Sequence, residues 1–125
     1  MAGFYIIRDN LEERLNLPKD GYEIPLLIQD KSFNPDGSLF YPDNATPPVE
    51  KPVPSTPSFF FGNTIAVNGR LWPYLDVEPR KYRFRILNGS NLRAYDIRLS
   101  NGAKFWQIGT DQGFLEHSVE IDSFI

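Results

Sequence analysis

For much of its length the chain alternates short apolar runs with polar turn sequences, a pattern typical of β-strands rather than long helices. The clearest strand is 82–86, where three apolar side chains alternate with two arginines, so that each kind occupies one face. Residues 93–99 alternate in the same way. Shorter strands are predicted at 4–7, 22–28, 59–61, 64–67, 105–108 and 119–121. Strands at a spacing of roughly 8–12 residues predict an all-β antiparallel sandwich or barrel.

Turn sequences punctuate this pattern. Asn68-Gly69 predicts a type I′ hairpin, because both central positions of that turn need a positive φ. The sequence Asn-Pro-Asp-Gly at 34–37 is a strong turn signal. Six prolines between residues 42 and 57 exclude a helix or a central strand there, and predict a long, semi-rigid loop with polyproline character.

One short helix is predicted near the start of the chain. Asp9 and Glu12 have the spacing of a capping box, and Pro18 ends the apolar pattern that follows, which gives a helix over 10–16. Within the strand at 22–28, Pro25 cannot donate to a sheet ladder. It therefore predicts that this strand lies at an edge or carries a bulge.

Composition narrows the chemistry that the chain can perform. Its 125 residues include 13 Lys and Arg, 16 Asp and Glu, one His and no Cys, with a net charge of −3. The absence of Cys excludes disulfides, thiolate nucleophiles and blue-copper thiolate ligands, and one His excludes a site of several histidines. The mild negative charge argues against nucleic-acid binding. No apolar run approaches the ~18 residues of a membrane span.

Few residues qualify as catalytic candidates. His117 is the one imidazole, and its neighbours Glu116 and Ser118 would point to the other face of a strand, so we expect a surface histidine. Three carboxylate pairs are spaced for acid–base chemistry, but such pairs on a strand are usually solvated. They are Asp76 with Glu78, Asp111 with Glu116, and Glu120 with Asp122. The sequence therefore predicts no catalytic residue.

A short basic cluster is the most distinctive charged feature. Arg80, Lys81, Arg83 and Arg85 lie within six positions. They either form a solvated or salt-bridged face of the sheet, or make an interdomain contact, because guanidinium groups suit bidentate recognition of carboxylates. Arg80, Arg83 and Arg85 are the candidates for that contact.

The segment 64–88 resembles the middle-domain motif of multicopper oxidases. It has a Val-Asn-Gly hairpin at 67–69, then a Pro and a Val, and finally an Arg-x-Arg strand that ends in Asn88. Ile-Gly-Thr-Asp-Gln-Gly at 108–113 looks like the next segment of that motif, and 22–41 is similar to the start of the domain. The best match is to the spore-coat laccase and bilirubin oxidase branch, with Pro79 where the family often has Gly.

The resemblance implies a cupredoxin-like Greek-key sandwich. In this family the coppers lie in the first and third of three such domains, on His-x-His motifs and a Cys, none of which occurs here. We therefore expect 1–9 to be the last strand of a preceding cupredoxin domain and 10–21 to be a linker with a short helical turn. Residues 22–125 would be most of a copper-free middle domain that is incomplete at its C-terminal end.

These expectations define the function hypotheses. The first is a structural part of a laccase-like oxidase, which holds no copper itself and contacts the remaining domains. The parent would oxidise phenolic or bilirubin-like substrates or metal ions and reduce dioxygen to water. Its location would be the spore coat, or it would be secreted or in the cell envelope. The alternatives are an autonomous β-sandwich binding module and a subunit that completes an oxidase in trans. The module would use an aromatic platform formed by Trp72, Tyr74, Trp106 and Phe114. An unpaired edge strand would also favour self-association.

Overall fold

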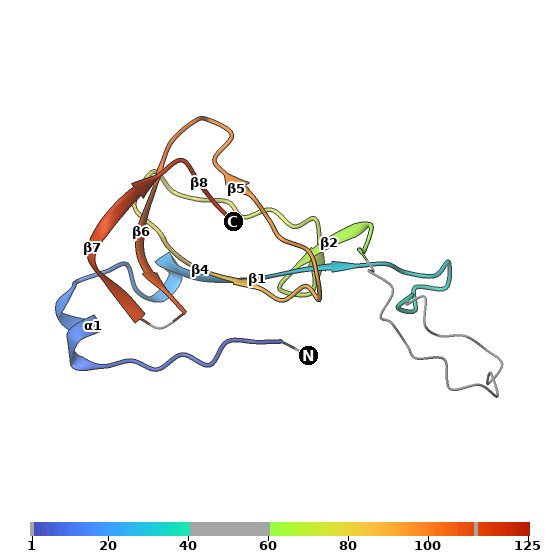
Figure 1. Cartoon of the computed structure of the whole chain (residues 1–125), viewed down its shortest axis with the longest axis horizontal. Helices are drawn as coiled ribbons and strands as arrows, with labels where there is room; N and C mark the ends of the chain where they lie inside the picture. Colours follow the sequence, from blue (N-terminus) through green and yellow to red (C-terminus); the bar gives the residue numbers. More distant parts are fainter. Residues whose placement is uncertain (1, 41–60, 112) are drawn as a thin grey trace. The chain divides into compact units, whose positions relative to one another are not determined.

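The computed structural model describes residues 2–40, 61–111 and 113–125, so the proline-rich loop predicted at 42–57 lies outside the described residues. The chain divides into two compact units, Met1–Arg93 and Ala94–Ile125. Each is described here by itself. The described residues carry eight strands and two short helices, which confirms the all-β prediction. Strands are the main elements of the chain in Figure 1.

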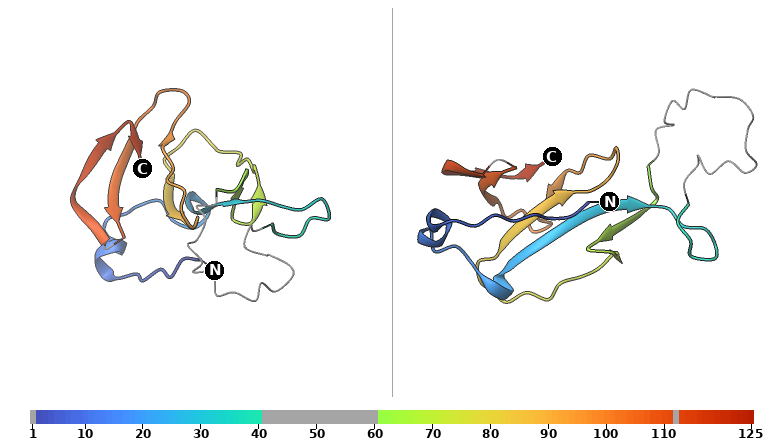
Figure 2. Two further views of the ribbon diagram at one scale, coloured as in Figure 1. Left: turned by 45° about the vertical axis from the view of Figure 1, so that its right-hand side comes forward. Right: turned by 90° about the horizontal axis from the view of Figure 1, so that it is seen from below.

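The sheet of the first unit has the strand order β3-β2-β1-β4. These strands are β1 (Glu23–Lys31), β2 (Thr64–Val67), β3 (Arg70–Leu71) and β4 (Arg83–Asn88). The β1–β2 and β2–β3 pairs are antiparallel, but β1 and β4 run parallel, with their arrows pointing the same way in Figure 2. The prediction of purely antiparallel pairing was therefore wrong for this pair. A parallel pair is joined by a long connection, and strand direction across such a connection leaves no local sequence signal.

The β2–β3 hairpin forms as predicted. Asn68 and Gly69 have φ angles of 50° and 78°, and Val67 pairs with Arg70 across the turn. The Asn68 side chain also extends the sheet beyond the end of β2. Its Oδ1 accepts a hydrogen bond from Leu27 N at 2.9 Å, and its Nδ2 donates to Pro25 O at 2.8 Å.

Pro25 occupies a locally exposed edge of an interior strand. β1 pairs with β4 from Glu23 onward, but its pairing with β2 begins at Ile28. In the sheet, β1 lies between β2 and β4. The sequence had favoured an edge or bulged strand for Pro25, and an interior position was not anticipated. The proline is accommodated because no β2 residue pairs with it.

The segment before the sheet contains the short helix α1 (Asn10–Arg14), two residues shorter than predicted, because Asn16 adopts a φ of 48°. Asp9 caps it by accepting a hydrogen bond from Glu12 N at 2.8 Å, as the capping-box spacing predicted. A 3-10 helix, η1 (Asp20–Tyr22), leads into β1. Residues 4–7 form no strand, which corrects the prediction, because no other described segment supplies their backbone with a ladder.

A polar contact on β1 holds Gly62 and Arg93 together. Asp30, on β1, accepts hydrogen bonds from Gly62 N at 2.7 Å and from Arg93 Nε at 3.0 Å. Arg93 Nη2 in turn donates to Gly62 O at 2.9 Å. Residues 59 and 60 are not described, and Phe61 lies in no strand, so the strand predicted at 59–61 is not observed at its one described residue. Beyond β1, Gly37 N donates to Asn34 O at 2.9 Å, which confirms the predicted turn at 34–37.

The second unit consists of two strand pairs. β6 (Phe105–Thr110) and β7 (Gly113–Ile121) form an antiparallel hairpin, and β5 (Ile97–Arg98) pairs with β8 (Ser123–Phe124). The strand predicted at 93–99 is thus only two residues long, and β8 was not predicted because a two-residue run has no readable periodicity. Phe105 packs edge to face on Phe124, with ring centroids 5.1 Å apart.

Burial within the described residues is unusual. Ala66, at 5% exposure, is the one buried hydrophobic side chain among them, whereas Glu12, Ser32 and Arg83 are buried polar side chains. Many large apolar side chains remain exposed, such as Tyr5 at 92%. In these parts of the chain, buried polar side chains therefore outnumber buried hydrophobic ones.

Candidate functional site

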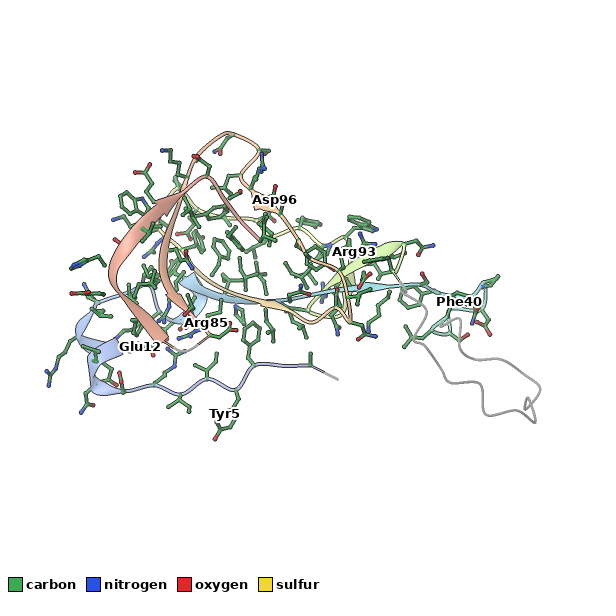
Figure 3. The ribbon with its side chains drawn as sticks, viewed as in Figure 1. Tyr5, Glu12, Phe40, Arg85, Arg93 and Asp96 are labelled. Atoms are coloured by element: carbon green, nitrogen blue, oxygen red, sulfur yellow. The ribbon has the colours of Figure 1, made fainter. Side chains whose placement is uncertain are left out.

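Five charged side chains of the first unit converge beside α1. We call them the arginine–glutamate cluster: Arg8, Glu12, Glu23, Arg83 and Arg85. The capped first turn of α1 presents Glu12. The parallel register aligns Glu23 with Arg83 and Pro25 with Arg85, so that Glu23 and both arginines share one face of the sheet. Figure 3 shows Glu12 and Arg85 next to each other at this end of the sheet.

Glu12 is the centre of the cluster. Its Oε1 accepts hydrogen bonds from Arg83 Nη1 at 2.6 Å, Arg8 Nη1 at 2.9 Å and Arg85 Nη2 at 2.9 Å. Its side chain is 8% exposed and that of Arg83 is 6% exposed. Because three guanidinium groups contact one buried oxygen, Glu12 joins the segment before the sheet to β4, 71 positions away.

Glu23 completes the cluster from β1. Arg85 Nε donates to its Oε1 at 2.5 Å, and Arg8 Nη2 donates to its Oε2 at 2.8 Å. Burial raises the pKa of Glu23, but the hydrogen bonds from Arg85 and Arg8 and the charge of Arg83 outweigh it, so that the pKa lies below its ordinary value. The hydrogen bond to Glu23 raises the pKa of Arg8. Each of these two shifts favours the charged form of its group.

Asp30 behaves in the same way. Burial raises its pKa, but hydrogen bonds from Ser90, Arg93 and Gly62 lower it by more, so that the pKa lies below its ordinary value. Both carboxylates stabilise the folded state at neutral pH, because the unfolded chain binds their protons more readily.

We predict from these two groups that the free energy of unfolding is nearly constant from neutral pH down to about pH 5 and falls steeply below it. The ordinary pKa values are 4.5 for Glu and 3.8 for Asp. As the pH drops through these values and then through the lower folded ones, the unfolded state takes up protons first. Urea unfolding at a series of pH values measures this dependence. A Glu23→Gln variant should show a shallower acid slope, and an unchanged slope would contradict the assignment.

The chemistry available to the cluster is charge pairing. It borders an open hollow of about 410 Å³, which acidic and basic side chains line in equal number. Each cluster member already has an opposite charge within 3.0 Å. The geometry of the cluster is that of a network of ion pairs between α1, β1 and β4.

The structure brings together two of the three arginines predicted for an interdomain contact. Arg83 and Arg85 belong to the cluster, and Arg83 is buried, which excludes a solvated face at that position. Arg80 lies elsewhere: its guanidinium carbon stands 3.3 Å from the centroid of the Tyr22 ring, and its Nη1 is 3.9 Å from Glu78. A contact of these arginines with another domain stays a prediction.

The other candidates remain at the surface. The His117 side chain is 86% exposed, with Nε2 3.9 Å from Glu116, which is 92% exposed, as expected for a surface histidine. Of the carboxylate pairs, Glu120 and Asp122 both face Lys104 Nζ, at 3.0 Å and 3.9 Å. They form a surface charge contact.

The proposed aromatic platform is divided between the units. Trp72 and Tyr74 belong to the first unit and are 68% and 88% exposed, whereas Trp106 and Phe114 belong to the second. Neither unit by itself therefore carries all four rings.

Comparison with known proteins identifies the family. No family model matches the chain. It is 57% identical to a laccase of Bacillus stratosphericus and 54% identical to a laccase of Bacillus subtilis strain 168, each over 127 aligned residues. These alignments cover 99% of this chain but 25% and 24% of the relatives, so the chain spans about a quarter of their length. This chain belongs to the multicopper oxidase family.

The fold of this multicopper oxidase chain agrees with that assignment. The structure matches the McoA multicopper oxidase of Aquifex aeolicus with a TM-score of 0.70 at 40% identity, over 92% of this chain and 24% of the other. The family resemblance and the cupredoxin-like β fold predicted from the sequence are confirmed.

The chain's own donor set does not fit the copper sites of an oxidase. Copper in such enzymes prefers imidazole and thiolate ligands, whereas this multicopper oxidase chain has one His and no Cys. That His117 side chain is 86% exposed and has no second imidazole beside it to complete a ligand set. Within 2–40, 61–111 and 113–125, no three His, Cys, Asp or Glu side chains gather as a metal site. In the same ranges no helix has the length and apolar character to cross a membrane.

Sequence reasoning found the arginines but missed their acidic partners. Glu12 was recognised for its capping position, and Glu23 was not singled out. The capping-box spacing was a usable signal, since it places a carboxylate at the start of a helix that precedes the sheet. No local pattern signals the pairing of Arg93 with Asp30, which lie 63 positions apart.

Proposed function

We propose that this chain is a copper-free structural region of a laccase-like multicopper oxidase. The proposal rests on membership of the family together with a sequence that has one histidine, which is exposed, and no cysteine. The region would hold the copper-bearing domains of the parent in place, and the parent would oxidise phenolic or bilirubin-like substrates or metal ions with reduction of dioxygen to water.

The contacts of the first unit support a structural role. The arginine–glutamate cluster attaches the segment that carries α1 to β1 and β4 through buried ion pairs rather than through an apolar core. Such pairs depend on geometry and so favour one arrangement of the joined segments. An attachment of this kind suits a region whose task is to set the positions of its neighbours.

The exposed apolar side chains support contacts with the remaining oxidase domains. A free-standing binding module of this length would be expected to bury a core of large apolar side chains. Here Tyr5, Tyr74 and Ile125 are about nine-tenths exposed, at 92%, 88% and 91%. Cover from further domains would remove this surface from water.

The proposal predicts that the chain by itself binds no stoichiometric copper and does not oxidise phenols. After incubation with cupric ion and washing with a chelator, elemental analysis should find far less than one copper per chain, and dioxygen uptake with a phenolic substrate should stay at the blank rate. A His117→Gln variant identifies any weak surface binding, since only that binding disappears. About one retained copper per chain, or measurable oxidation, would overturn the proposal.

A further inference from the structure

Three Asn-Gly sequences in this chain have different surroundings. They are Asn68-Gly69, Asn88-Gly89 and Asn101-Gly102. In such a pair the backbone nitrogen of glycine can attack the side-chain carbonyl carbon of asparagine, because glycine has no side chain to hinder the approach. The attack needs an asparagine amide that is free to turn and a glycine N–H that can leave its own hydrogen bond.

Asn68 and Asn88 fail that requirement. The Asn68 side chain is held against β1 by hydrogen bonds to Leu27 N and Pro25 O, at 2.9 Å and 2.8 Å. The Asn88 amide nitrogen donates to Arg93 O at 2.7 Å, and Gly89 N donates to Ile28 O on β1 at 2.8 Å. Freeing either site therefore requires breaking contacts with the sheet of the first unit.

Asn101 meets the requirement. Its Oδ1 accepts a hydrogen bond from Ala103 N at 3.0 Å, which folds the side chain over the next peptide, and no described residue bonds its amide nitrogen. Gly102 N donates to Leu99 O at 3.0 Å within the same turn, and Gly102 has a φ of +73°. Asn101 and both of the following residues are exposed. A turn bond of this kind opens locally, without disturbing a strand pair.

We propose that Asn101 is a site of spontaneous deamidation in the folded protein and that Asn68 and Asn88 are protected by the sheet. The Gly102 nitrogen forms a bond to Asn101 Cγ and gives up its proton, while the side-chain nitrogen leaves as ammonia, so that a cyclic succinimide results. Water then opens this ring at either carbonyl, which gives aspartate or isoaspartate at position 101. Water is the only co-reactant, no electron is transferred, and the product carries one additional negative charge.

The test incubates the native chain in mildly alkaline buffer and follows each site by tryptic peptide mapping. Cleavage after Arg70, Arg93 and Lys104 places the three sites in separate peptides. The reacted peptide gains the mass that replaces NH2 by OH, and isoaspartate-specific methyl transfer detects the rearranged product. We expect Asn101 to react at least about tenfold faster than Asn68 or Asn88, because its turn opens locally, whereas the other two sites react only when the sheet opens.

The same measurement in concentrated urea is the control for local sequence. The three sites should then react at similar rates, because each precedes glycine and no fold protects it. An Asn101→Gln variant should lose the reaction in its own peptide and leave the other two peptides unchanged. Equal native rates at the three sites would overturn the proposal, and so would a native ratio that persists in urea.

Discussion

Replacing Glu12 by Gln lowers the free energy of unfolding by about 3–5 kcal/mol, the cost of removing one partner from a buried ion pair. The substitution keeps the shape of the side chain but removes the charge that Arg83, Arg8 and Arg85 contact. Arg83 is 6% exposed, and its ion pair with Glu23 is longer, at 3.6 Å, than the one it loses. Urea denaturation of the chain, followed by circular dichroism, measures the loss.

Glu13→Gln provides the matched control. Glu13 is the next residue of α1, also in its first turn, and is exposed. We expect its substitution to change the free energy of unfolding by less than about 0.5 kcal/mol, as is usual for surface positions. Equal effects of the two substitutions would show that helix composition, and not the cluster, determines the result.

A double-mutant cycle separates the cluster from the individual residues. Because Glu12 and Arg83 contact each other directly, the effects of Glu12→Gln and Arg83→Met should not add. The double variant should be more stable than the sum of the two single losses implies, since neither charge is then left buried without the other. Strict additivity would argue that the two residues act independently.

Replacing Gly62 by Ala destabilises the fold by about 3 kcal/mol, at the upper end of the usual cost of inserting an atom into a packed site. A Cβ at this position would collide with Lys31 N and would lie 2.7 Å from both Asp30 C and Lys31 C. These are backbone atoms of β1, so no side-chain rotation relieves the clash. Any backbone shift would also weaken the hydrogen bond from Gly62 N to Asp30.

Gly21→Ala is the corresponding control. No atom lies within 4 Å of the Cβ that this substitution adds, and Gly21 does not have a positive φ. We expect a neutral effect or a gain of up to about 1 kcal/mol, because alanine restricts the unfolded chain more than glycine does. Thermal unfolding of both variants makes the comparison, and a Gly62→Ala protein as stable as the Gly21→Ala protein would contradict the close approach.

The two largest predicted losses fall at a buried ion pair and at a close backbone approach, which follows from how the described residues are packed. Ala66 is their one buried hydrophobic side chain, whereas Glu12 and Arg83 are buried and charged. Removing one member of a charged pair costs the desolvation of the other, which is larger than the loss of one half-buried methyl group. The positions that hold this region together are therefore its ion pairs and its closest backbone approaches.

Local sequence determined the features that depend on a few neighbouring residues. Asn68-Gly69 forms the hairpin because both residues tolerate a positive φ, and Asp9 caps α1 because its carboxylate reaches the free N–H of Glu12. The alternation at 82–86 identified most of β4, and the motif at 64–88 identified the family. These signals are short-range, so one sequence was enough to find them.

The tertiary structure alone decided which distant segments meet. It set the parallel register that places Glu23 opposite Arg83, and it left 4–7 without a strand partner. It also joined Glu12 to Arg83 and Asp30 to Arg93. Local propensity cannot specify such pairings, because the free energy of a contact between segments 60 or 70 positions apart depends on strand register and burial. The arginines could therefore be found in the sequence, but their carboxylate partners became known only once the chain was folded.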